Sequence, residues 1–469
     1  MADERPDIVV VLTDQMRRDA LGFYGDPNLR TPTLDAMAHE GIAFDCLSST
    51  FPACVPFRFS LMTGQYAHTR MVPALGYRLS PAERTLGEAV RACGYHTAYV
   101  GKWHLHSLYG TVGGQTLAQA NRTPIPPASR RGWDDWRGFE LRNDYRDTWI
   151  FFDEETEPRP LPGYQTDALF DIARHWLDTP RDRPGFLLLS VEAPHPPFSA
   201  PDEAIEAVRR RGPFRPAPNV DIDAISAFPP EWDQMLAGGK TMASASGAER
   251  RAIFAANMQT YCAMIEVIDA QMARLLAEAR ERSRPTVFVF LSDHGELGGS
   301  HGMLGKAEPF EESIGVPFIV HATDPALVPP GRRCGVPLCT EDLFPTLVGL
   351  AGGAEPDAPG LDLSGLIGGA APEPDREGVL IEFVAEVRPA RRYHDETWRG
   401  IRTRQAKYVV IGNASGTRPW MHFDLRADPY EQANLVGRPT RRAEMLELHE
   451  RLTRLVAETG DDFPIRPVA

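Results

Sequence analysis

Three residues with metal-binding side chains stand directly after apolar runs in this sequence. Asp14 follows the run Ile8–Leu12 after one threonine, and Asp293 and His294 follow a second run after one serine. Two carboxylates and an imidazole form a donor set suited to a divalent cation, and Gln15 adds an amide oxygen beside them. A single Asp after a strand is more often a helix cap than a metal ligand. The prediction of a cation site therefore depends on the whole set.

Five further residues carry positive charge or can transfer protons. They are Arg58, Lys102, His104, His195 and Lys306. Arg and Lys pair strongly with anionic oxygens, and His can give or take a proton near neutral pH. Such groups beside a cation are suited to binding a tetrahedral oxyanion.

The elements that must position these residues are short apolar runs separated by helical patterns. Five runs predict strands at Ile8–Leu12, His96–Val100, Phe186–Val191, Thr286–Leu291 and Val316–Val320. Apolar residues at helical spacing predict helices at Thr85–Cys93 and Phe254–Ala279. Continuous apolar strands alternating with helices predict an α/β fold whose mostly parallel sheet is covered on both faces. Four of the strands end next to candidate site residues, which should therefore meet at one edge of the sheet.

The remaining segments predict loops and a smaller second unit. Ser107–Thr166 and Ala200–Gly247 are rich in Gly, Pro and small residues, and we expect them to form walls over the sheet edge where substrate is selected. Gly352–Asp375, dense in Gly, Pro and Asp, marks a boundary that divides the chain into an α/β domain (1–370) and a C-terminal α+β subdomain (371–469). In the subdomain we expect strands at Gly378–Val387, Thr397–Ile411 and Trp420–Leu425 and a helix at Arg441–Thr459.

Four aromatic residues lie in the first of these loop segments. Trp133, Trp136, Tyr145 and Trp149 are able to line a pocket for an aryl or sugar ring. At this density, aromatic residues are more often packing anchors, and we favour that interpretation.

Composition narrows the class of protein. The 469 residues are 42% hydrophobic and 24% charged, which is ordinary for a soluble globular protein. A net charge of −14 argues against a nucleic-acid surface, although a local cationic cluster can still attract an anionic substrate. The sequence has no secretory signal pattern, no apolar run of membrane-spanning length and only six cysteines. We therefore expect a cytoplasmic protein with reduced thiols and with no nucleic-acid or membrane partner. Its oligomeric state is open, with a homo-oligomer as one alternative.

Several motifs resemble those of one known family. Cys54-Val55-Pro56-Phe57-Arg58 resembles the C-x-P-x-R signature of the sulfatases, which belong to the alkaline phosphatase superfamily. Further matches, in the expected order along nearly the whole chain, are Gly101-Lys102-Trp103-His104, Ser292-Asp293-His294-Gly295-Glu296, Gly305-Lys306 and Phe423-Asp424-Leu425. The resemblance implies an alkaline-phosphatase-like, mixed and mostly parallel sheet flanked by helices, with a smaller C-terminal α+β subdomain.

The resemblance also implies the cofactors. In sulfatases, a maturation enzyme oxidises the signature cysteine, here Cys54, to formylglycine, and the hydrate of this aldehyde attacks sulfur. By the same match, Asp14, Gln15, Asp293 and His294 bind one divalent cation together with residue 54. We expect Ca²⁺ first and Mn²⁺ as the alternative.

The remaining site residues receive roles by the same match. Arg58 and Lys102 would neutralise the hydrated aldehyde and the sulfate oxygens, and His104 would be the base that releases sulfate. His195 and Lys306 would bind the sulfate oxygens, one of them acting as general acid toward the leaving alcohol.

The chain departs from the common family pattern at a few positions. Many sulfatases have a second Asp where this chain has Gln15, and Asn or Asp is common at the place of His294. This combination resembles choline-sulfatase-like and phosphonate-monoester-hydrolase-like members. Phe57 and Phe59 are bulkier than the residues usual around the signature Arg, which bears on the efficiency of maturation.

The predicted function is hydrolysis of a small organic sulfate monoester. A phosphonate monoester or phosphodiester hydrolase is the nearest alternative, because such substrates carry the same single negative charge as a sulfate monoester. A catalytically silent binding relative, with Cys54 left as a thiol, is an alternative of another class.

Overall fold

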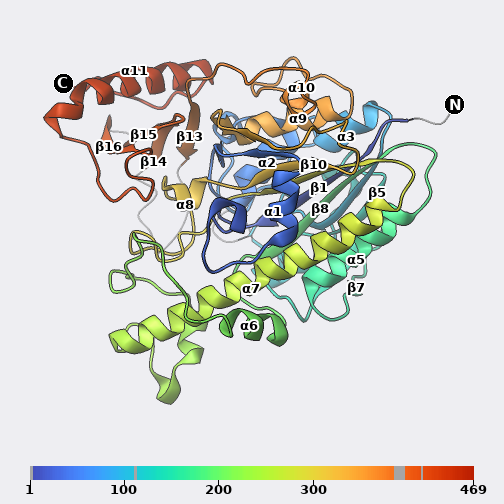
Figure 1. Ribbon diagram of the computed structural model, residues 1–469, viewed down its shortest axis with the longest axis horizontal. Coiled ribbons are helices and arrows are strands. Elements are labelled where there is room, and N and C mark those ends of the chain that lie inside the picture. The colour runs from blue at the N-terminus through green and yellow to red at the C-terminus, as the bar shows by residue number, and fades with distance from the viewer. Residues whose placement is uncertain (1–3, 110–113, 385–396, 414–415, 469) are drawn as a thin grey trace.

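A ten-stranded sheet forms the centre of the protein (Figure 1). The computed structural model describes residues 4–109, 114–384, 397–413 and 416–468. The strands of the sheet are β1 (Asp7–Asp14), β2 (Ile42–Phe44), β4 (His96–Lys102), β5 (Asp135–Phe139), β6 (Trp149–Phe152), β7 (Arg159–Pro160), β8 (Gly185–Pro194), β9 (Thr286–Ser292), β10 (Phe318–Ala322) and β11 (Arg332–Cys334). Their order is β11-β2-β10-β9-β1-β8-β4-β5-β6-β7.

The middle of this sheet is parallel. Strands β9, β1, β8, β4 and β5 are consecutive neighbours, and each neighbouring pair runs parallel. This arrangement confirms the predicted α/β fold with a mostly parallel sheet. Strand β10, the fifth predicted strand, pairs antiparallel with both β9 and β2. The sheet is therefore mixed.

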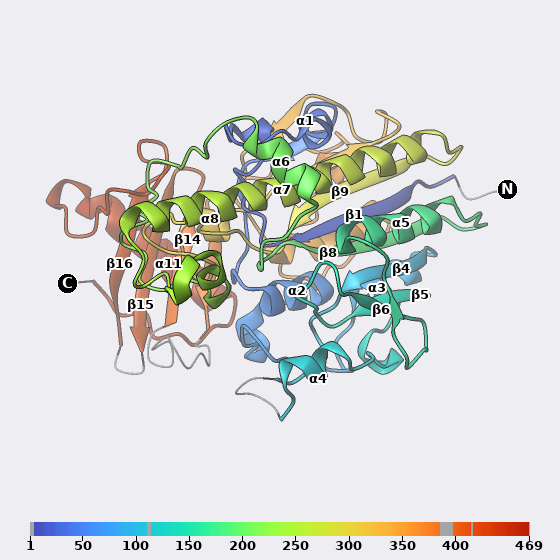
Figure 2. The same cartoon turned by 90° about the horizontal axis from the view of Figure 1, so that it is seen from below.

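Helices cover both faces of the sheet and create two cores. In β1, the side chains of Ile8, Val10 and Leu12 enter one core, whereas Val9 and Val11 enter the other. The first core packs against α2 (Cys54–Thr63), α3 (Leu86–Ala92), α9 (Leu343–Leu350) and α10 (Ser364–Ile367). The second packs against α1 (Pro32–His39), α5 (Gln165–Asp178), α6 (Asp202–Arg209) and α7 (Gly247–Arg280), of which α5 and α7 run along the sheet in Figure 2. Both faces of a strand such as β1 are buried, which explains its continuous apolar sequence.

The two expected loop segments contain regular structure. Ser107–Thr166 holds α4 (Leu117–Asn121) and the strands β5, β6 and β7, which extend the main sheet. The prediction of a loop was wrong for this segment. Asp135 and Arg137 interrupt the apolar pattern of β5 and are partly exposed, which hides the strand in the sequence. Ala200–Gly247 contains only α6 and short 3-10 helices.

The four aromatic residues of the first segment are packing residues, as we favoured. Trp133, Trp136, Tyr145 and Trp149 are between 1% and 8% exposed. Trp136 stacks on the ring of Tyr99 in β4, with 5.0 Å between the ring centroids. These rings therefore attach the β5–β6 region to the main sheet.

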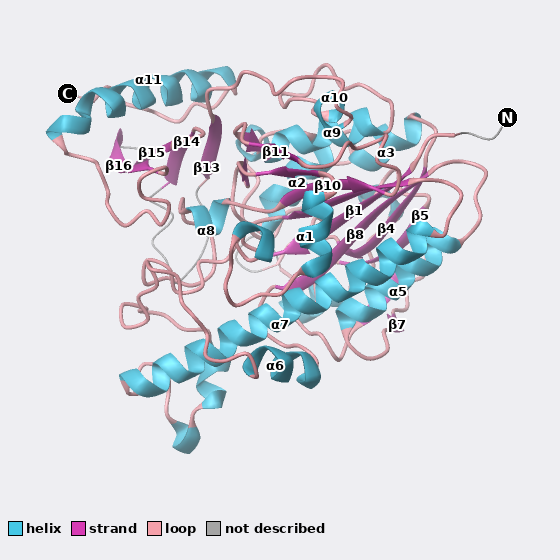
Figure 3. Cartoon of the chain, viewed as in Figure 1, coloured by secondary structure: helices cyan, strands magenta, loops and turns pink. Residues whose placement is uncertain are grey.

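A second, four-stranded antiparallel sheet forms the C-terminal subdomain (Figure 3). It consists of β13 (Val379–Phe383), β14 (Thr397–Arg402), β15 (Ala406–Asn413) and β16 (Gly416–Asp424), and α11 (Arg442–Glu458) packs against it. The predicted strand Thr397–Ile411 is two strands joined by a turn, and positions 385–387 of the predicted strand Gly378–Val387 lie outside the described residues. The predicted terminal helix is confirmed. Among the described helices, none combines the length and apolarity that crossing a membrane requires.

One buried acid near α2 makes stability dependent on pH. Glu341 is 0% exposed and accepts a hydrogen bond from the hydroxyl of Thr50. Burial raises the pKa of Glu341 from 4.5 to about 7. Folded protein therefore keeps a proton that the unfolded chain loses between these values, so the free energy of unfolding falls as pH rises from about 5 to 8.

We predict that Glu341→Gln stabilises the protein at pH 8 and leaves it nearly unchanged at pH 5. The gain at pH 8 should approach about 3 kcal/mol, because each unit of pKa shift corresponds to about 1.4 kcal/mol. Denaturant unfolding at both pH values measures it, with the exposed Glu447→Gln as control. An equal pH dependence in Glu341→Gln and wild-type protein would contradict this assignment.

Candidate active site

Helix α2 places Cys54 and Arg58 on the same side of one turn. Cys54 is the first residue of α2, and Arg58 lies four positions further along. Pro56 fits the first turn because the backbone N–H groups there need no intrahelical acceptor. The helix ends at Gly64, whose φ of 70° is the left-handed conformation that favours glycine. All ten residues of α2 are buried, so the position of Cys54 is fixed by packing on every side.

The carboxyl ends of adjacent parallel strands bring the other side chains to Cys54. Asp14 ends β1 and Lys102 ends β4, while Asp293 directly follows β9. Gly101 precedes Lys102 with a φ of 105°, and a Cβ there would meet the carbonyl oxygen of Ser190 at 1.9 Å. Only glycine permits this close approach of β4 to β8. The predicted convergence at one sheet edge is therefore what the structure contains.

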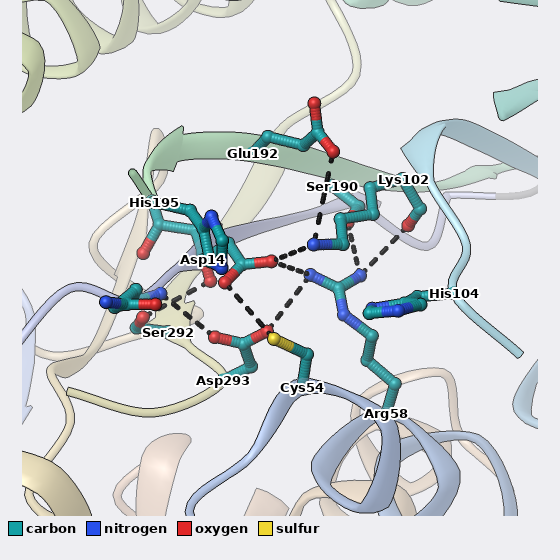
Figure 4. A network of polar contacts seen from close by, with 12 residues as sticks. Asp14, Cys54, Arg58, Lys102, His104, Ser190, Glu192, His195, Ser292 and Asp293 are labelled. Atoms are coloured by element: carbon teal, nitrogen blue, oxygen red, sulfur yellow. Dashed lines mark hydrogen bonds and ion pairs between the residues drawn. The ribbon is translucent and has the colours of Figure 1, made fainter. Parts of the chain in front are cut away.

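Four of the predicted cation ligands lie close together. Ligand atoms of Asp14, Cys54, Asp293 and His294 are all within 4.8 Å of one another, and all four residues are buried. The Cys54 sulfur lies 3.1 Å from His294 Nε2 and 3.5 Å from Asp14 Oδ1. Figure 4 shows Asp14, Asp293 and Cys54 pointing toward one another from three different elements.

The chemistry of these atoms fits a divalent cation. His294 Nδ1 donates to the carbonyl oxygen of Gly295 at 3.0 Å, so Nε2 presents its lone pair to the cluster. That nitrogen lies 3.6 Å from Asp14 Oδ1 and 3.5 Å from Asp293 Oδ1. Burial, followed by the nearby Lys306, holds the pKa of His294 well below its usual range, so the imidazole is neutral. Three acceptor atoms that face one another in a buried site are best satisfied by a cation between them.

Two buried cations compensate the negative charge of the cluster. Lys102 Nζ lies 2.7 Å from Asp14 Oδ2, and Arg58 lies 3.3 Å from the same carboxylate and 3.1 Å from Asp293 Oδ2. Burial alone would raise the pKa of Asp14, but the charges of Lys102 and Arg58 hold it well below its usual range. Asp14 is therefore ionised, as a cation ligand must be.

The thiol of Cys54 is a poor nucleophile in this environment. Burial, and then the charge of Asp14, raise its pKa to about 11. The thiol is therefore protonated at neutral pH, and a protonated thiol reacts slowly.

The remaining predicted residues surround this cluster. His195 Nδ1 donates to the carbonyl oxygen of Pro196 at 2.6 Å, which leaves Nε2 as an acceptor. Lys306 Nζ lies 3.4 Å from the Cys54 sulfur. His104, held at a φ of 60°, bonds through Nε2 to the hydroxyl of Tyr109. Burial lowers the pKa of both His195 and His104 well below the usual value, so each is neutral and able to accept a proton.

Sequence reasoning missed the residues that support this site. Ser190 accepts a 2.8 Å hydrogen bond from Arg58, and Tyr109 bonds to His104. Glu192 lies 4.0 Å from Lys102 Nζ, and Glu296 accepts a hydrogen bond from Gln15. The available signal for Glu192 was its position directly after the apolar run Phe186–Val191, and for Glu296 it was the short distance from Asp293 and His294.

Comparison with known families gives two matches. The model described as sulfatase matches residues 6–354. The model described as N-sulphoglucosamine sulphohydrolase, C-terminal, matches residues 299–458. Together these matches span both the main sheet and the C-terminal subdomain.

Individual proteins agree with the family matches. An ulvan-active sulfatase from Formosa agariphila is 32% identical over 98% of this chain and 83% of its own length. A protein solved in complex with its substrate D-glucosamine-2-N,6-O-disulfate has a TM-score of 0.79 and 20% identity, covering 98% of this chain and 99% of that one. The phosphonate monoester hydrolase of Agrobacterium radiobacter has a TM-score of 0.71 and 24% identity, with 97% and 96% covered. This chain therefore belongs to the sulfatase family of the alkaline phosphatase superfamily and is a hydrolase that acts on sulfuric esters.

Proposed function

We propose that the protein removes a sulfate group from a sulfated saccharide, using a divalent cation and a formylglycine formed from Cys54. The observation that carries the chemistry is the convergence of Asp14, Asp293 and His294 on Cys54. Support for a saccharide comes from the ulvan-active relative, which matches over 98% of this chain.

Cation binding is assigned to side chains from two strand ends. Asp14 ends β1 and Gln15 follows it, Asp293 and His294 follow β9, and residue 54 completes the set. We propose Ca²⁺, because oxygen atoms predominate among these ligands, and Mn²⁺ is the alternative. When present, the cation stabilises negative charge on the ester oxygens, and the hydrated aldehyde of formylglycine supplies the nucleophilic hydroxyl.

The protein's own residues then perform the proton transfers and hold the anion. Lys306 and His195 are partly exposed, unlike the buried Arg58 and Lys102. They contact the sulfate oxygens, and one of them is the general acid toward the leaving alcohol. His104, neutral and buried, accepts the proton whose loss releases sulfate. Arg58 and Lys102 keep Asp14 ionised and in place.

The first experiment compares substrates with the same aryl leaving group. Protein is produced together with a formylglycine-generating enzyme and supplied with Ca²⁺ or Mn²⁺. We expect kcat/KM for the aryl sulfate to exceed that for the aryl phosphonate monoester at least about 100-fold, or by about 3 kcal/mol in transition-state binding. A ratio below one would indicate that the substrate is a phosphonate monoester and not a sulfate ester.

Two further measurements test the remaining parts of the proposal. Sulfate release from a sulfated oligosaccharide should proceed with a higher kcat/KM than release from the aryl sulfate, and the reverse order would contradict a saccharide substrate. Peptide mass analysis should find the aldehyde at position 54. A peptide that is wholly thiol, in protein without activity, would favour the silent binding relative.

A further inference from the structure

Behind the proposed cation site, a buried glutamate holds the side chain of Gln15. Gln15 and Glu296 are each 2% exposed. Gln15 Nε2 donates to Glu296 Oε2. The other carboxylate oxygen, Oε1, accepts the backbone N–H groups of Gly298 at 2.8 Å and Gly305 at 2.7 Å. Glu296 is thus fixed by its own loop, and it fixes Gln15 in turn.

The amide of Gln15 has one orientation that satisfies all its neighbours. Lys306 Nζ donates to Gln15 Oε1 at 2.7 Å and also lies 3.4 Å from the Cys54 sulfur. An ammonium group can only donate, and a carboxylate accepts, so the amide oxygen faces the site and the amide nitrogen faces Glu296. The opposite orientation would set the NH₂ group of Gln15 against Lys306.

The backbone of Gln15 is held independently of this contact. Its N–H donates to Asp293 Oδ1 at 3.0 Å, and its carbonyl accepts the hydroxyl of Tyr261 at 3.0 Å, at a φ of 70°. The direction of the side-chain amide is therefore what Glu296 decides.

We infer that Glu296 is a positioning residue that turns the Gln15 oxygen toward the cation, and that the pair Gln15 and Glu296 replaces a carboxylate ligand at position 15. The single negative charge is then on Glu296, which is hydrogen-bonded to the ligand Gln15, and not on the ligand itself. This inference rests on the proposed function, because it concerns the same cation site.

The substitution Glu296→Gln should reverse the Gln15 amide. The oxygen of the introduced amide replaces Oε1 as the acceptor for Gly298 and Gly305, so its NH₂ group faces Gln15. Gln15 must then turn its own oxygen away from the site. Loss of such supporting contacts costs about 10- to 100-fold in metal affinity. In the double variant Gln15→Glu/Glu296→Gln, the carboxylate at position 15 has one oxygen for the cation and another for the amide at position 296. The affinity for Ca²⁺ should therefore return to within about threefold of wild type.

The test is calorimetric titration of Ca²⁺ into protein made without the maturation enzyme, so that residue 54 is a thiol in every sample. Glu140→Gln is the matched control. Like Glu296, Glu140 is buried (1% exposed) and accepts two backbone N–H groups, at 2.9 and 2.7 Å, through one oxygen. The control should keep the wild-type Kd. Unchanged affinity in Glu296→Gln, or no recovery in the double variant, overturns the inference.

Two controls separate the possible failures. Wild-type protein that binds neither Ca²⁺ nor Mn²⁺ would overturn the proposed cation site. If wild-type protein binds Ca²⁺ but the affinity is not lost in Glu296→Gln and regained in the double variant, only the role of Glu296 is overturned. If thermal unfolding reveals that Glu296→Gln does not fold, Gln15→Glu is compared with the double variant. The double variant must then bind Ca²⁺ more tightly than Gln15→Glu, because the single variant sets two buried carboxylates against each other, and equal affinity would overturn the inference.

Discussion

Cys54→Ala should lower kcat/KM for an aryl sulfate by about 10⁴-fold or more, because it removes the proposed nucleophile. The side chain of Cys54 lies 3.1 Å from His294 Nε2 and 3.5 Å from Asp14 Oδ1, at the centre of the acceptor cluster. Steady-state kinetics on protein produced with the maturation enzyme measures the effect.

The matched control for this variant is Cys262→Ala. Cys262 is a buried free thiol on α7 in the second core, so its loss should affect stability but leave kcat/KM within about twofold. If Cys54→Ala kept activity within tenfold of wild type, another group would have to be the nucleophile.

Asp14→Asn should weaken Ca²⁺ binding by roughly 100-fold or more and lower kcat/KM in parallel. One oxygen of Asp14 faces the proposed cation, and the other lies 2.7 Å from Lys102 Nζ and 3.3 Å from Arg58. A neutral amide removes the charge that offsets these two cations, and breaking a buried ion pair costs about 3–5 kcal/mol. Calorimetric titration of Ca²⁺ and kinetics of the same preparation measure both effects.

Asp45→Asn is the control for this second variant. Asp45 pairs at 2.7 Å with Arg333, whose side chain is 56% exposed, and an exposed pair contributes little. The control should bind Ca²⁺ as wild type does. Unchanged Ca²⁺ affinity in Asp14→Asn would show that the cation does not bind at the end of β1.

The strands that carry the site could be predicted because their signal is local. Ile8–Leu12 is a continuous apolar run, which predicts a buried strand. The polar residue after the run then lies at the edge of the sheet where the neighbouring strands also end. The direction of β10 could not be predicted, because a buried apolar run reads the same in parallel and antiparallel pairing. Strand β5 was missed since Asp135 and Arg137 give its sequence the character of a loop.

The supporting residues of the site were beyond prediction for a different reason. Glu192 stands 90 positions along the chain from Lys102, and Glu296 stands 281 positions from Gln15. Contacts across such distances in the sequence leave no periodic signal, so only the folded chain reveals which buried acid supports which ligand.

The complete burial of α2 limits when Cys54 can be modified. All ten residues of this helix are enclosed, and Cys54 itself is 2% exposed. An enzyme must reach the side chain that it modifies, and the folded protein does not expose Cys54. The maturation that we propose for Cys54 therefore takes place while the chain is still unfolded, and a molecule that folds with a thiol at this position keeps it until it unfolds again. Under the proposed function, the fraction of active protein in a preparation is thus decided during synthesis, by whether Cys54 is oxidised before the chain folds.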